Sequence, residues 1–445
     1  MTEQNDSGYR GKALQAITKA KITIGDRIRA TKGEQAYEGI LIPRSEYADE
    51  NHIVIKLKNG YNLGIALTPE TSIRKIGEGT KPAFAAPTLP KENENLPKVV
   101  VMSTGGTIAS RVDYRTGAVR PALTANDLYS VVPELSNIAR IDAQILYSLF
   151  SENITPKHWT EIAQKVAQEI RAGVDGVVLT HGTDTMGYTS AALSFALQDL
   201  PVPVILVGSQ RSADRPSSDA PTNLIGAVTA AAYAPLAEVT LAFHESPSDT
   251  AIVLHRGTKV RKCHTSRRDT FRSINASPIA KVENQKVVML TENFRRRDRS
   301  KKLVLKPEFD DKVALLKFHP GMDPRVLEWY LDNDFKGLIL EGTGLGHVSK
   351  FLHGALQAAA RKDVVVGMAS QCIWGRVNMN VYYSGRDLLS LGVIPLEDML
   401  AETALVKLMW IFGQTHDIEE AKVLLRKNLV GEFSPRTLLD RVGNG

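Results

Sequence analysis

Two turns in this chain combine glycines with hydroxyl side chains in a way that can support chemistry. The first turn is Ser-Thr-Gly-Gly-Thr at 103–107, and the second is Thr-His-Gly-Thr-Asp-Thr-Met at 180–186. Glycines let backbone N–H groups approach a ligand closely, and a threonine hydroxyl becomes a nucleophile when a base removes its proton. The second turn also carries the carboxylate of Asp184. A bound phosphate, a catalytic hydroxyl or a simple strand-to-helix corner would each account for such turns.

The glycine pattern disfavours phosphate binding. A P-loop requires G-x-x-x-x-G-K-[ST], and no lysine follows Gly106. A second run, Gly342-x-Gly344-x-Gly346, lacks the third-glycine spacing of a dinucleotide loop, and Asp363 precedes the next apolar run instead of ending it. Nucleotide binding at these loops is therefore not expected.

The key residues of both turns also have structural interpretations. Thr107 can be a first-turn helix residue with a satisfied hydroxyl, and Asp184 can be the N-cap of the helix that follows it. Taken singly, each structural role is the commoner one. Both turns follow predicted core strands, however, and ligands gather at the carboxyl ends of strands in open parallel sheets. The pairing of the turns therefore favours a ligand site.

The residues around the turns alternate between strand and helix patterns. Buried-type strands are predicted at 99–102, 177–180, 202–207 and 239–243, with helices after Thr155-Pro156, over 187–197 and around 223–233. This alternation weakens over 252–310. It then resumes with strands at 313–318, 337–340 and 364–368 and helices near 324–332, 350–361 and 397–412. The pattern predicts parallel sheets covered by helices on both faces.

The N-terminal 80 residues follow a different pattern. Short runs punctuated by glycines predict strands at 22–24, 27–30, 38–43, 52–57 and 63–67, and Asn59-Gly60 is a strong hairpin signal. With 12 basic and 10 acidic residues, this segment is not an evident nucleic-acid binder. We predict four parts, namely a small β-barrel domain at 1–80, a proline-containing linker at 81–97, an α/β domain at 98–311 and a smaller α/β domain at 312–445.

The composition is ordinary for a globular protein, with 43% hydrophobic and 23% charged residues in 445. No apolar run is long enough to cross a membrane, and the polar N-terminus lacks the apolar core of a signal peptide. The only two cysteines, Cys263 and Cys372, do not indicate a disulfide framework. The histidines lack metal-ligand spacing, so no metal site is expected. We predict a cytoplasmic protein without a membrane segment.

The positive charge is concentrated in one segment. Residues 256–306 hold 16 Lys or Arg and four Asp or Glu, a net charge of +12 against +6 for the whole chain, so the remaining residues are slightly acidic. Within this segment, 295–302 is the densest basic cluster. Such a segment can attract RNA or an acidic protein surface, or it can be a solvated charged loop.

The two turns resemble the signatures of the bacterial type I/II L-asparaginase and glutaminase-asparaginase family. T-G-G-T-I-A-S at 104–110 and T-H-G-T-D-T-M at 180–186 occur in the family's order, and the similarity continues through Gly208-Ser209-Gln210 and Val260-Arg261-Lys262 to Ser370. An asparaginase-like body that follows a β-barrel and a proline linker is similar to the D-subunit family of archaeal Glu-tRNA(Gln) amidotransferases. The implied fold is an α/β, asparaginase-like two-domain parallel-sheet body with an N-terminal small β-barrel domain.

The resemblance implies roles for individual residues. Those that correspond to the family's catalytic positions are the nucleophile Thr107, the lid tyrosine Tyr114, and Thr183, Asp184 and Lys262. Ser151 and Glu152 correspond to substrate-holding residues, although this chain reads Ser-Glu-Asn where the family reads Ser-Gln-Asp. Either Lys262 or Tyr114 would serve as the base, while glycine N–H groups and Thr183 would stabilise the oxyanion.

The resemblance also implies a reaction and its partners. The family's D subunit releases ammonia from glutamine, and its E subunit uses the ammonia to amidate tRNA-bound glutamate. ATP and Mg²⁺ belong to the E subunit, and the D subunit has no cofactor. The implied assembly contains two D and two E subunits, with a homodimer of D, and contacts tRNA(Gln) through the complex. The alternatives are a stand-alone L-asparaginase with an accessory domain, and an RNA-binding or scaffolding protein with an inactive enzyme fold.

Overall fold

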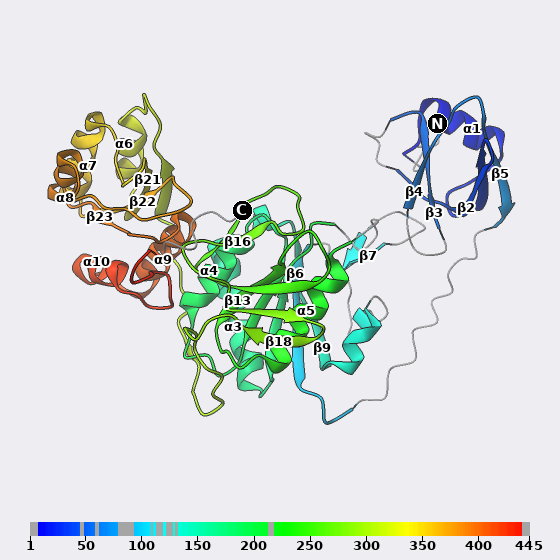
Figure 1. Ribbon diagram of the computed structural model, residues 1–445. Coiled ribbons are helices and arrows are strands. Elements are labelled where there is room, and N and C mark those ends of the chain that lie inside the picture. The colour runs from blue at the N-terminus through cyan, green and yellow to red at the C-terminus, as the bar shows by residue number, and fades with distance from the viewer. Residues whose placement is uncertain are drawn as a thin grey trace.

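A computed structural model describes residues 8–44, 49–57, 62–78, 93–106, 108, 110–112, 119–121, 128–129, 132–211 and 218–437. Three larger sheets organise these residues (Figure 1). They are a five-stranded sheet near the N-terminus, an eight-stranded sheet in the middle of the chain and a four-stranded sheet toward the C-terminus. In the described part of the chain, no helix is both long enough and apolar enough to cross a membrane.

The N-terminal sheet is antiparallel and has the order β4-β3-β2-β1-β5. Its strands are β1 (Arg27–Lys32), β2 (Gln35–Leu41), β3 (His52–Lys56), β4 (Asn62–Ala66) and β5 (Thr71–Gly77), and they follow helix α1 (Gly11–Lys19). Alternate side chains such as Ile28, Ile53 and Ile55 fill its core. The small β domain is therefore confirmed, and among the described residues β4 and β5 form the two edges of the sheet.

Three details of this segment differ from the sequence prediction. Residues 22–24 are not a strand, because Thr23 donates its N–H and hydroxyl to Asp26 Oδ2 at 2.7 and 2.9 Å and so closes a turn. Helix α1 and strand β5 were not predicted. The predicted Asn59-Gly60 turn lies outside the described residues, although β3 and β4 pair antiparallel on either side of it, with Lys56 opposite Asn62.

The central sheet has the order β18-β17-β14-β13-β12-β10-β6-β9. Five neighbouring strands are parallel, namely β6 (Lys98–Gly105), β9 (Arg140–Leu149), β10 (Gly176–Thr180), β12 (Val204–Val207) and β13 (Val239–His244). The last three are antiparallel, namely β14 (Ala251–Arg256), β17 (Ala280–Glu283) and β18 (Lys286–Met289). The sheet is parallel around both turns, as predicted, and becomes mixed where the strand–helix alternation weakens.

Helices cover both faces of the central sheet. Helix α5 (Ala220–Tyr233) packs on one face through residues such as Leu224 and Val228. Helices α3 (Pro156–Arg171) and α4 (Met186–Ala196) pack on the other face through Ile162, Val166 and Leu193. All residues of β10 are buried, as expected for a central strand covered on both sides.

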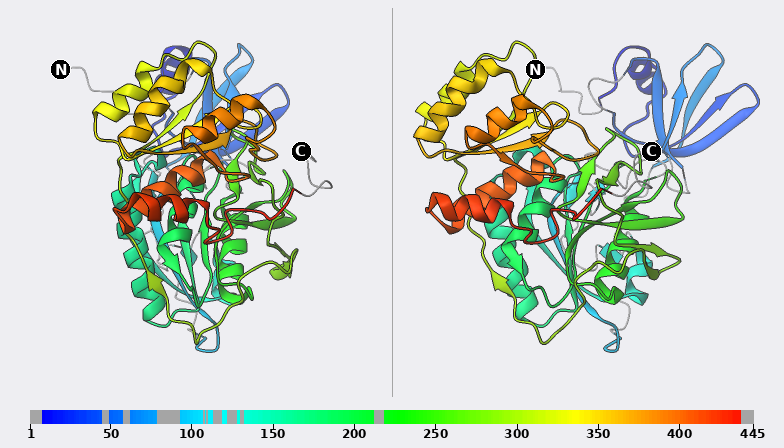
Figure 2. Two further views of the ribbon diagram at one scale, coloured as in Figure 1. Left: turned by 90° about the vertical axis from the view of Figure 1, so that its left-hand side faces the viewer. Right: turned by 60° about the vertical axis from the view of Figure 1, so that its left-hand side comes forward.

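The third sheet is parallel, with the order β20-β21-β22-β23. Its strands are β20 (Val313–Lys317), β21 (Gly337–Gly342), β22 (Val365–Ser370) and β23 (Ile394–Pro395), and its helices are α6 (Arg325–Asp332), α7 (His353–Arg361), α8 (Tyr383–Ser390), α9 (Ala401–Gln414) and α10 (Ile418–Arg426). Figure 2 shows α9 and α10, in orange to red, on the side of this smaller unit that faces the green central unit. Phe195 of α4 stacks on Trp410 of α9, with the ring centroids 5.8 Å apart.

A buried ion pair connects the smaller unit to the central one. Lys259 Nζ lies 2.7 Å from Asp398 Oδ2, and both side chains are almost fully buried. Burial lowers the pKa of Lys259, while the attraction of Asp398 works in the opposite direction. The other carboxylate oxygen of Asp398 accepts the Ser434 N–H at 2.9 Å. The last described segment of the chain is therefore tied to both units.

Candidate active site

Three segments leave the same edge of the central sheet side by side. Ser103 of β6 lies opposite Thr180 of β10, and Thr180 lies opposite Val207 of β12. The turns that follow these strands therefore start next to one another, at the carboxyl ends where ligands gather in parallel sheets.

The two glycine–threonine turns pack backbone against backbone. A Cβ atom on Gly106, whose φ is +80°, would lie 3.0 Å from the backbone nitrogen of Gly182. A Cβ atom on Gly182 would lie 2.8 Å from Ser151 Cβ. The hydroxyl of Thr104 donates to the Thr180 carbonyl at 3.0 Å. The described part of the first turn, the second turn and Ser151 thus converge, as the sequence predicts.

Lys262 joins the second turn from a distant part of the chain. It ends β15 (Val260–Lys262), which pairs with β16 (Phe271–Ser273) in a short hairpin. Its Nζ donates to Thr183 Oγ1 and to Asp184 Oδ1, each at 2.9 Å. The Lys262 side chain is 15% exposed and that of Asp184 is 71% exposed, so the amine is sheltered while the carboxylate faces solvent.

The second turn does not use Asp184 as a helix cap. Helix α4 begins at Met186, and its N-cap is Thr185, which makes no side-chain capping bond. The Thr185 hydroxyl donates instead to the Ser151 carbonyl at 2.6 Å. The structural interpretation of Asp184 is therefore wrong, and its carboxylate is available to Lys262.

Gly208 supports the second turn from behind. A Cβ atom there would lie 2.7 Å from the His181 carbonyl oxygen and 3.0 Å from Thr183 Cγ2. Gly208 directly follows β12, so only a glycine allows the third strand end to approach Thr183 this closely.

A buried hydrogen-bond chain also fixes the second turn, and sequence reasoning missed it. Trp159 Nε1 donates to Thr189 Oγ1 at 3.1 Å, and that hydroxyl lies 2.9 Å from His181 Nε2. His181 Nδ1 lies 2.7 Å from the Gly182 carbonyl, which can only accept, so Nδ1 carries the proton and Nε2 accepts from Thr189. Burial lowers the pKa of His181 to about 4, against the opposing effect of the Gly182 bond. His181 is thus a neutral, structural histidine.

We expect the protein to lose stability in mild acid. Burial lowers the pKa of His181 to about 4 and that of His255 to about 3, whereas an exposed histidine titrates near 6.5. The unfolded chain therefore binds more protons below about pH 6.5, and each histidine then costs about 1.4 kcal/mol per pH unit until its folded value is reached. Urea unfolding at pH 7.5 and pH 5.5 measures this loss, and His181→Asn should show a shallower dependence. Equal midpoints at both pH values would contradict it.

The other predicted site residues have different positions. Ser151 is buried at the start of a short 3₁₀ helix (Ser151–Asn153), beside Gly182, and Glu152 is exposed in the same helix. Thr107 and Tyr114 lie outside the described residues. Within the described ranges, no group of three or more His, Cys, Asp or Glu side chains could hold a metal ion.

Six acidic residues from elsewhere in the chain pair with the basic segment and offset half of its net charge of +12. Most of its 16 basic side chains form ion pairs, and the acidic partners from outside the segment are Asp175, Asp184, Glu238, Asp249, Asp398 and Glu402. These partners account for the slightly acidic remainder of the chain. The segment is therefore neither a fully solvated loop nor a surface free to bind RNA along its whole length.

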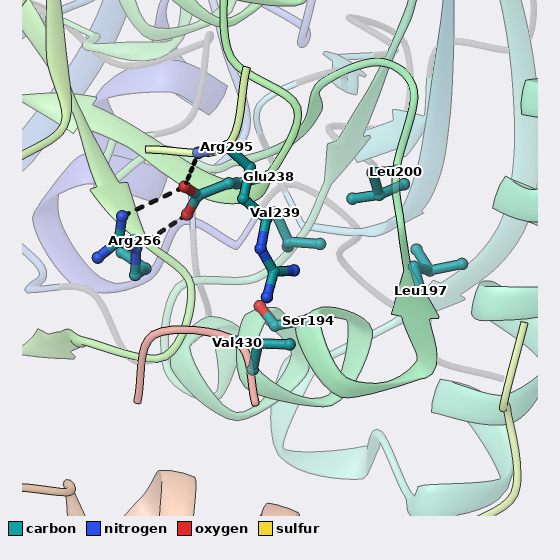
Figure 3. Close-up of a pocket in the computed structure, with 8 residues that line it drawn as sticks. All are labelled: Ser194, Leu197, Leu200, Glu238, Val239, Arg256, Arg295 and Val430. Carbon is teal, nitrogen blue, oxygen red and sulfur yellow. Dashed lines mark hydrogen bonds and ion pairs between the residues drawn. The ribbon is translucent and has the colours of Figure 1, made fainter. Parts of the chain in front are cut away.

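Two arginines of the dense basic cluster at 295–302, Arg295 and Arg297, are bound to other parts of the fold, whereas the side chains of Arg296 and Arg299 are 73% and 59% exposed. Figure 3 shows Glu238 accepting from Arg256 and from the backbone nitrogen of Arg295, around a small pocket between α4 and β13. The Arg295 guanidinium donates to the Leu429 carbonyl at 2.6 Å. Arg297 donates to the Ala232 carbonyl at 2.9 Å, and burial lowers its pKa. Arg295 and Arg297 thus stabilise the structure.

Comparison with known proteins agrees with this arrangement. Family models match three parts of the chain: "GatD N-terminal domain" at 22–76, "Asparaginase, N-terminal" at 98–295, and "Glutaminase/Asparaginase C-terminal domain" at 312–425. Among solved structures, the thermostable L-asparaginase from Thermococcus kodakarensis is 34% identical, with a TM-score of 0.68, and covers 76% of this chain and 100% of its own. L-asparaginase I from Vibrio cholerae is 30% identical, with a TM-score of 0.67, and covers 76% of this chain and 99% of its own. The two α/β units are therefore those of the asparaginase class.

Nearly full-length relatives place the chain more narrowly. The D subunit of glutamyl-tRNA(Gln) amidotransferase from Methanothermobacter thermautotrophicus is 48% identical over 430 residues, which is 96% of this chain and 98% of the relative. The D subunit from Pyrococcus horikoshii is 49% identical over 430 residues, which is 95% of this chain and 98% of the relative. The chain belongs to the family of glutamyl-tRNA(Gln) amidotransferase D subunits, which confirms the resemblance drawn from the two turns.

Proposed function

We propose that this chain is the glutaminase subunit of a tRNA-dependent amidotransferase. It hydrolyses glutamine and supplies the ammonia with which a partner, the E subunit, converts Glu-tRNA(Gln) to Gln-tRNA(Gln). The observation that carries this proposal is the Lys262 amine, held 2.9 Å from both Thr183 and Asp184 at the sheet edge where the first turn also ends. Such a cluster suits attack on a carboxamide, because it supplies a proton carrier and a hydroxyl donor side by side.

The proposed reaction runs through an ester on Thr107. The Thr107 oxygen attacks the carboxamide carbon of glutamine while its proton passes to the neutral amine form of Lys262 or to the phenolate form of Tyr114. The carbon–nitrogen bond then breaks, the nitrogen takes a proton and leaves as ammonia, and the glutamyl group remains on Thr107. Water attacks this ester, which releases glutamate and returns the proton to the threonine oxygen.

Thr183 would act as the oxyanion donor in this reaction. Its oxygen accepts a hydrogen bond from Lys262, so the hydroxyl proton remains available to a substrate oxygen. The N–H groups of the glycine turns can act on the same oxygen. A well-placed donor of this kind contributes about 3–4 kcal/mol to transition-state stabilisation.

The two residues at 151–152 would hold the other end of the substrate. The exposed carboxylate of Glu152 can pair with the α-ammonium group of glutamine. Ser151, whose carbonyl is already bonded to Thr185, keeps its hydroxyl beside Gly182 for a substrate oxygen. These roles follow the family correspondence of the two positions.

We further propose that the chain works without a cofactor of its own, with ATP and Mg²⁺ in the E subunit. The assembly would be cytoplasmic and contain two D and two E subunits around a homodimer of D, with tRNA(Gln) bound by the complex. The proposed domain limits, 1–80, 81–97, 98–311 and 312–445, place the active site in the third part.

An assay with and without the partner tests this function. We expect the full chain with the E subunit to amidate Glu-tRNA(Gln) from glutamine or from ammonium chloride, and to hydrolyse glutamine faster than the chain alone. The alternative, a stand-alone L-asparaginase, is favoured by the likeness to solved L-asparaginases. Rapid asparagine hydrolysis that the E subunit leaves unchanged, without any glutamine-driven amidation, would establish the alternative and overturn the proposal.

A further inference from the structure

A second buried network lies behind Thr183 and ends on Gly208. The Asp219 carboxylate, fully buried at the start of α5, accepts the backbone N–H groups of Gln210 and Arg211 at 2.9 and 2.8 Å. Asn223 Nδ2 donates to the Gly208 carbonyl at 2.9 Å and to Asp219 Oδ2 at 3.1 Å. This network fixes the segment 208–211, which supports the second turn.

The orientation of Asn223 determines where one proton of His244 lies. Both neighbours of Asn223 Nδ2, the Gly208 carbonyl and Asp219 Oδ2, are hydrogen-bond acceptors. A flipped amide would place the Asn223 oxygen against these two acceptors, so the orientation of the amide is fixed. Asn223 Oδ1 therefore points at His244 Nδ1, 2.6 Å away. Because an amide oxygen only accepts, Nδ1 carries a proton.

The other ring nitrogen of His244 faces a carboxylate. His244 Nε2 lies 3.0 Å from Asp249 Oδ1, which also accepts from Arg268 Nη1 at 2.7 Å. Burial works to raise the pKa of Asp249, but its hydrogen bonds with His244 and Arg268 outweigh burial and hold that pKa below its ordinary value. An ionised Asp249 offers no proton, so Nε2 carries one as well.

The charges of this network balance. The His244 side chain is fully buried, and an isolated buried imidazolium would be costly. Asp249 lies on one side of the ring and Asp219 on the other, through Asn223, while Arg268 is bound to Asp249. These two anions and two cations sum to zero, which makes a doubly protonated ring acceptable at this position.

The network connects the two segments that flank the Lys262–Thr183 contact. One end is Gly208, against which Thr183 packs, and the other is Arg268, in the hairpin loop that follows Lys262. Cys263 N–H donates to the Thr270 carbonyl at 2.7 Å and closes this loop. We propose that His244, protonated on both ring nitrogens, is a positioning residue that holds Thr183 and Lys262 at hydrogen-bonding distance from each other. Its effect on catalysis rests on the proposed function.

The proton count can be measured without any activity assay. In the full chain labelled with ¹⁵N-histidine, we expect the His244 ring to show two protonated nitrogens at pH 7.5 by NMR, with His244→Gln used to assign the signals. Asp249→Asn keeps a hydrogen-bonding group but removes the charge, and it should reduce the ring to one proton. One protonated nitrogen in the wild-type ring, or two in Asp249→Asn, would overturn the inference.

Kinetics test the positioning role. His244→Gln, assayed well below its unfolding temperature, should lower kcat for glutamine hydrolysis at least tenfold and change KM less than threefold, because substrate-holding residues are untouched. The matched control is His255→Gln. His255 is a second buried histidine, lies on the adjacent strand β14 and contacts Ser273 through its ring. This variant should keep kcat within threefold of the wild type. Equal kcat for the two variants would overturn the positioning role. A wild type that hydrolyses no glutamine would instead refute the proposed function, and the NMR result would still decide the proton count.

Discussion

Replacing Thr107 with alanine should abolish glutamine-driven amidation of Glu-tRNA(Gln) while ammonium chloride still supports it. Removal of a nucleophile that forms a covalent intermediate lowers kcat by roughly 10³-fold to 10⁶-fold. Amidation by the E subunit needs only ammonia, so the assembled complex keeps its second activity. The measurement is the rate of Gln-tRNA(Gln) formation with each nitrogen donor, and Thr107→Ser should retain part of the glutamine rate.

Thr104 provides a control from the same turn. Its hydroxyl is buried and donates to the Thr180 carbonyl at 3.0 Å, so Thr104→Ala loses one buried hydrogen bond. We expect this to lower the free energy of unfolding by about 1 kcal/mol and to change the glutamine rate only a few-fold. If Thr104→Ala lost activity with glutamine and Thr107→Ala kept it, the nucleophile would be assigned to the wrong threonine.

Replacing Lys262 with methionine should lower the glutamine-driven rate by about 10³-fold, again with rescue by ammonium chloride. The substitution keeps the length of the side chain but removes the amine that donates to Thr183 and Asp184. Loss of a proton carrier costs about 10²-fold to 10⁴-fold, and the Thr183 hydroxyl also loses the donor that orients it. The measurement is kcat for glutamine hydrolysis, with ammonium-driven amidation as the check on folding.

Two further variants separate charge from position. Lys262→Arg keeps the charge but not the point-like geometry of an amine, so it should remain at least 10²-fold impaired. Lys281→Met removes a lysine from β17 that pairs with Glu283, away from the turns, and should leave kcat unchanged. A Lys262→Met enzyme with normal kcat would identify Tyr114 as the base, which a low rate in Tyr114→Phe would then support.

The parts of the site that lie next to one another in sequence were predictable. A strand leads into a glycine turn at 98–106, and a strand, a glycine turn and a helix follow each other at 176–196. Adjacent parallel strands bring such turns to one edge. The resemblance supplied Lys262, which contacts Thr183 across 79 residues of sequence. Spacing alone could not have found this pair, because it depends on a hairpin beyond β14. The roles of Thr107 and Tyr114 remain predictions.

The parts that sequence could not supply depend on long-range pairing. The basic segment could be interpreted as a surface for RNA or an acidic protein, or as a solvated loop, because its acidic partners, such as Asp175 and Asp398, are distributed over the rest of the chain. His181 and His244 gave no metal spacing and no periodic pattern, yet each orders a strand end through partners on other helices or loops. The antiparallel edge β14-β17-β18 likewise arises from pairing that local propensity does not determine.

The ties made by the last described residues bear on how the protein is synthesised. Leu429 accepts from Arg295, Ser434 donates to Asp398, and Glu432 forms a buried pair with Lys407, with 2.7 Å between the charged groups. Domains usually fold in order as the ribosome produces them. Here Arg295, in the first α/β unit, receives the Leu429 carbonyl only after the chain of the smaller unit has been synthesised. A nascent chain or a truncated expression product that stops before about residue 428 would leave the amine of Lys407 without Glu432 and the carboxylate of Asp398 without Ser434. Such a chain would be incompletely folded and therefore a substrate for quality-control proteases.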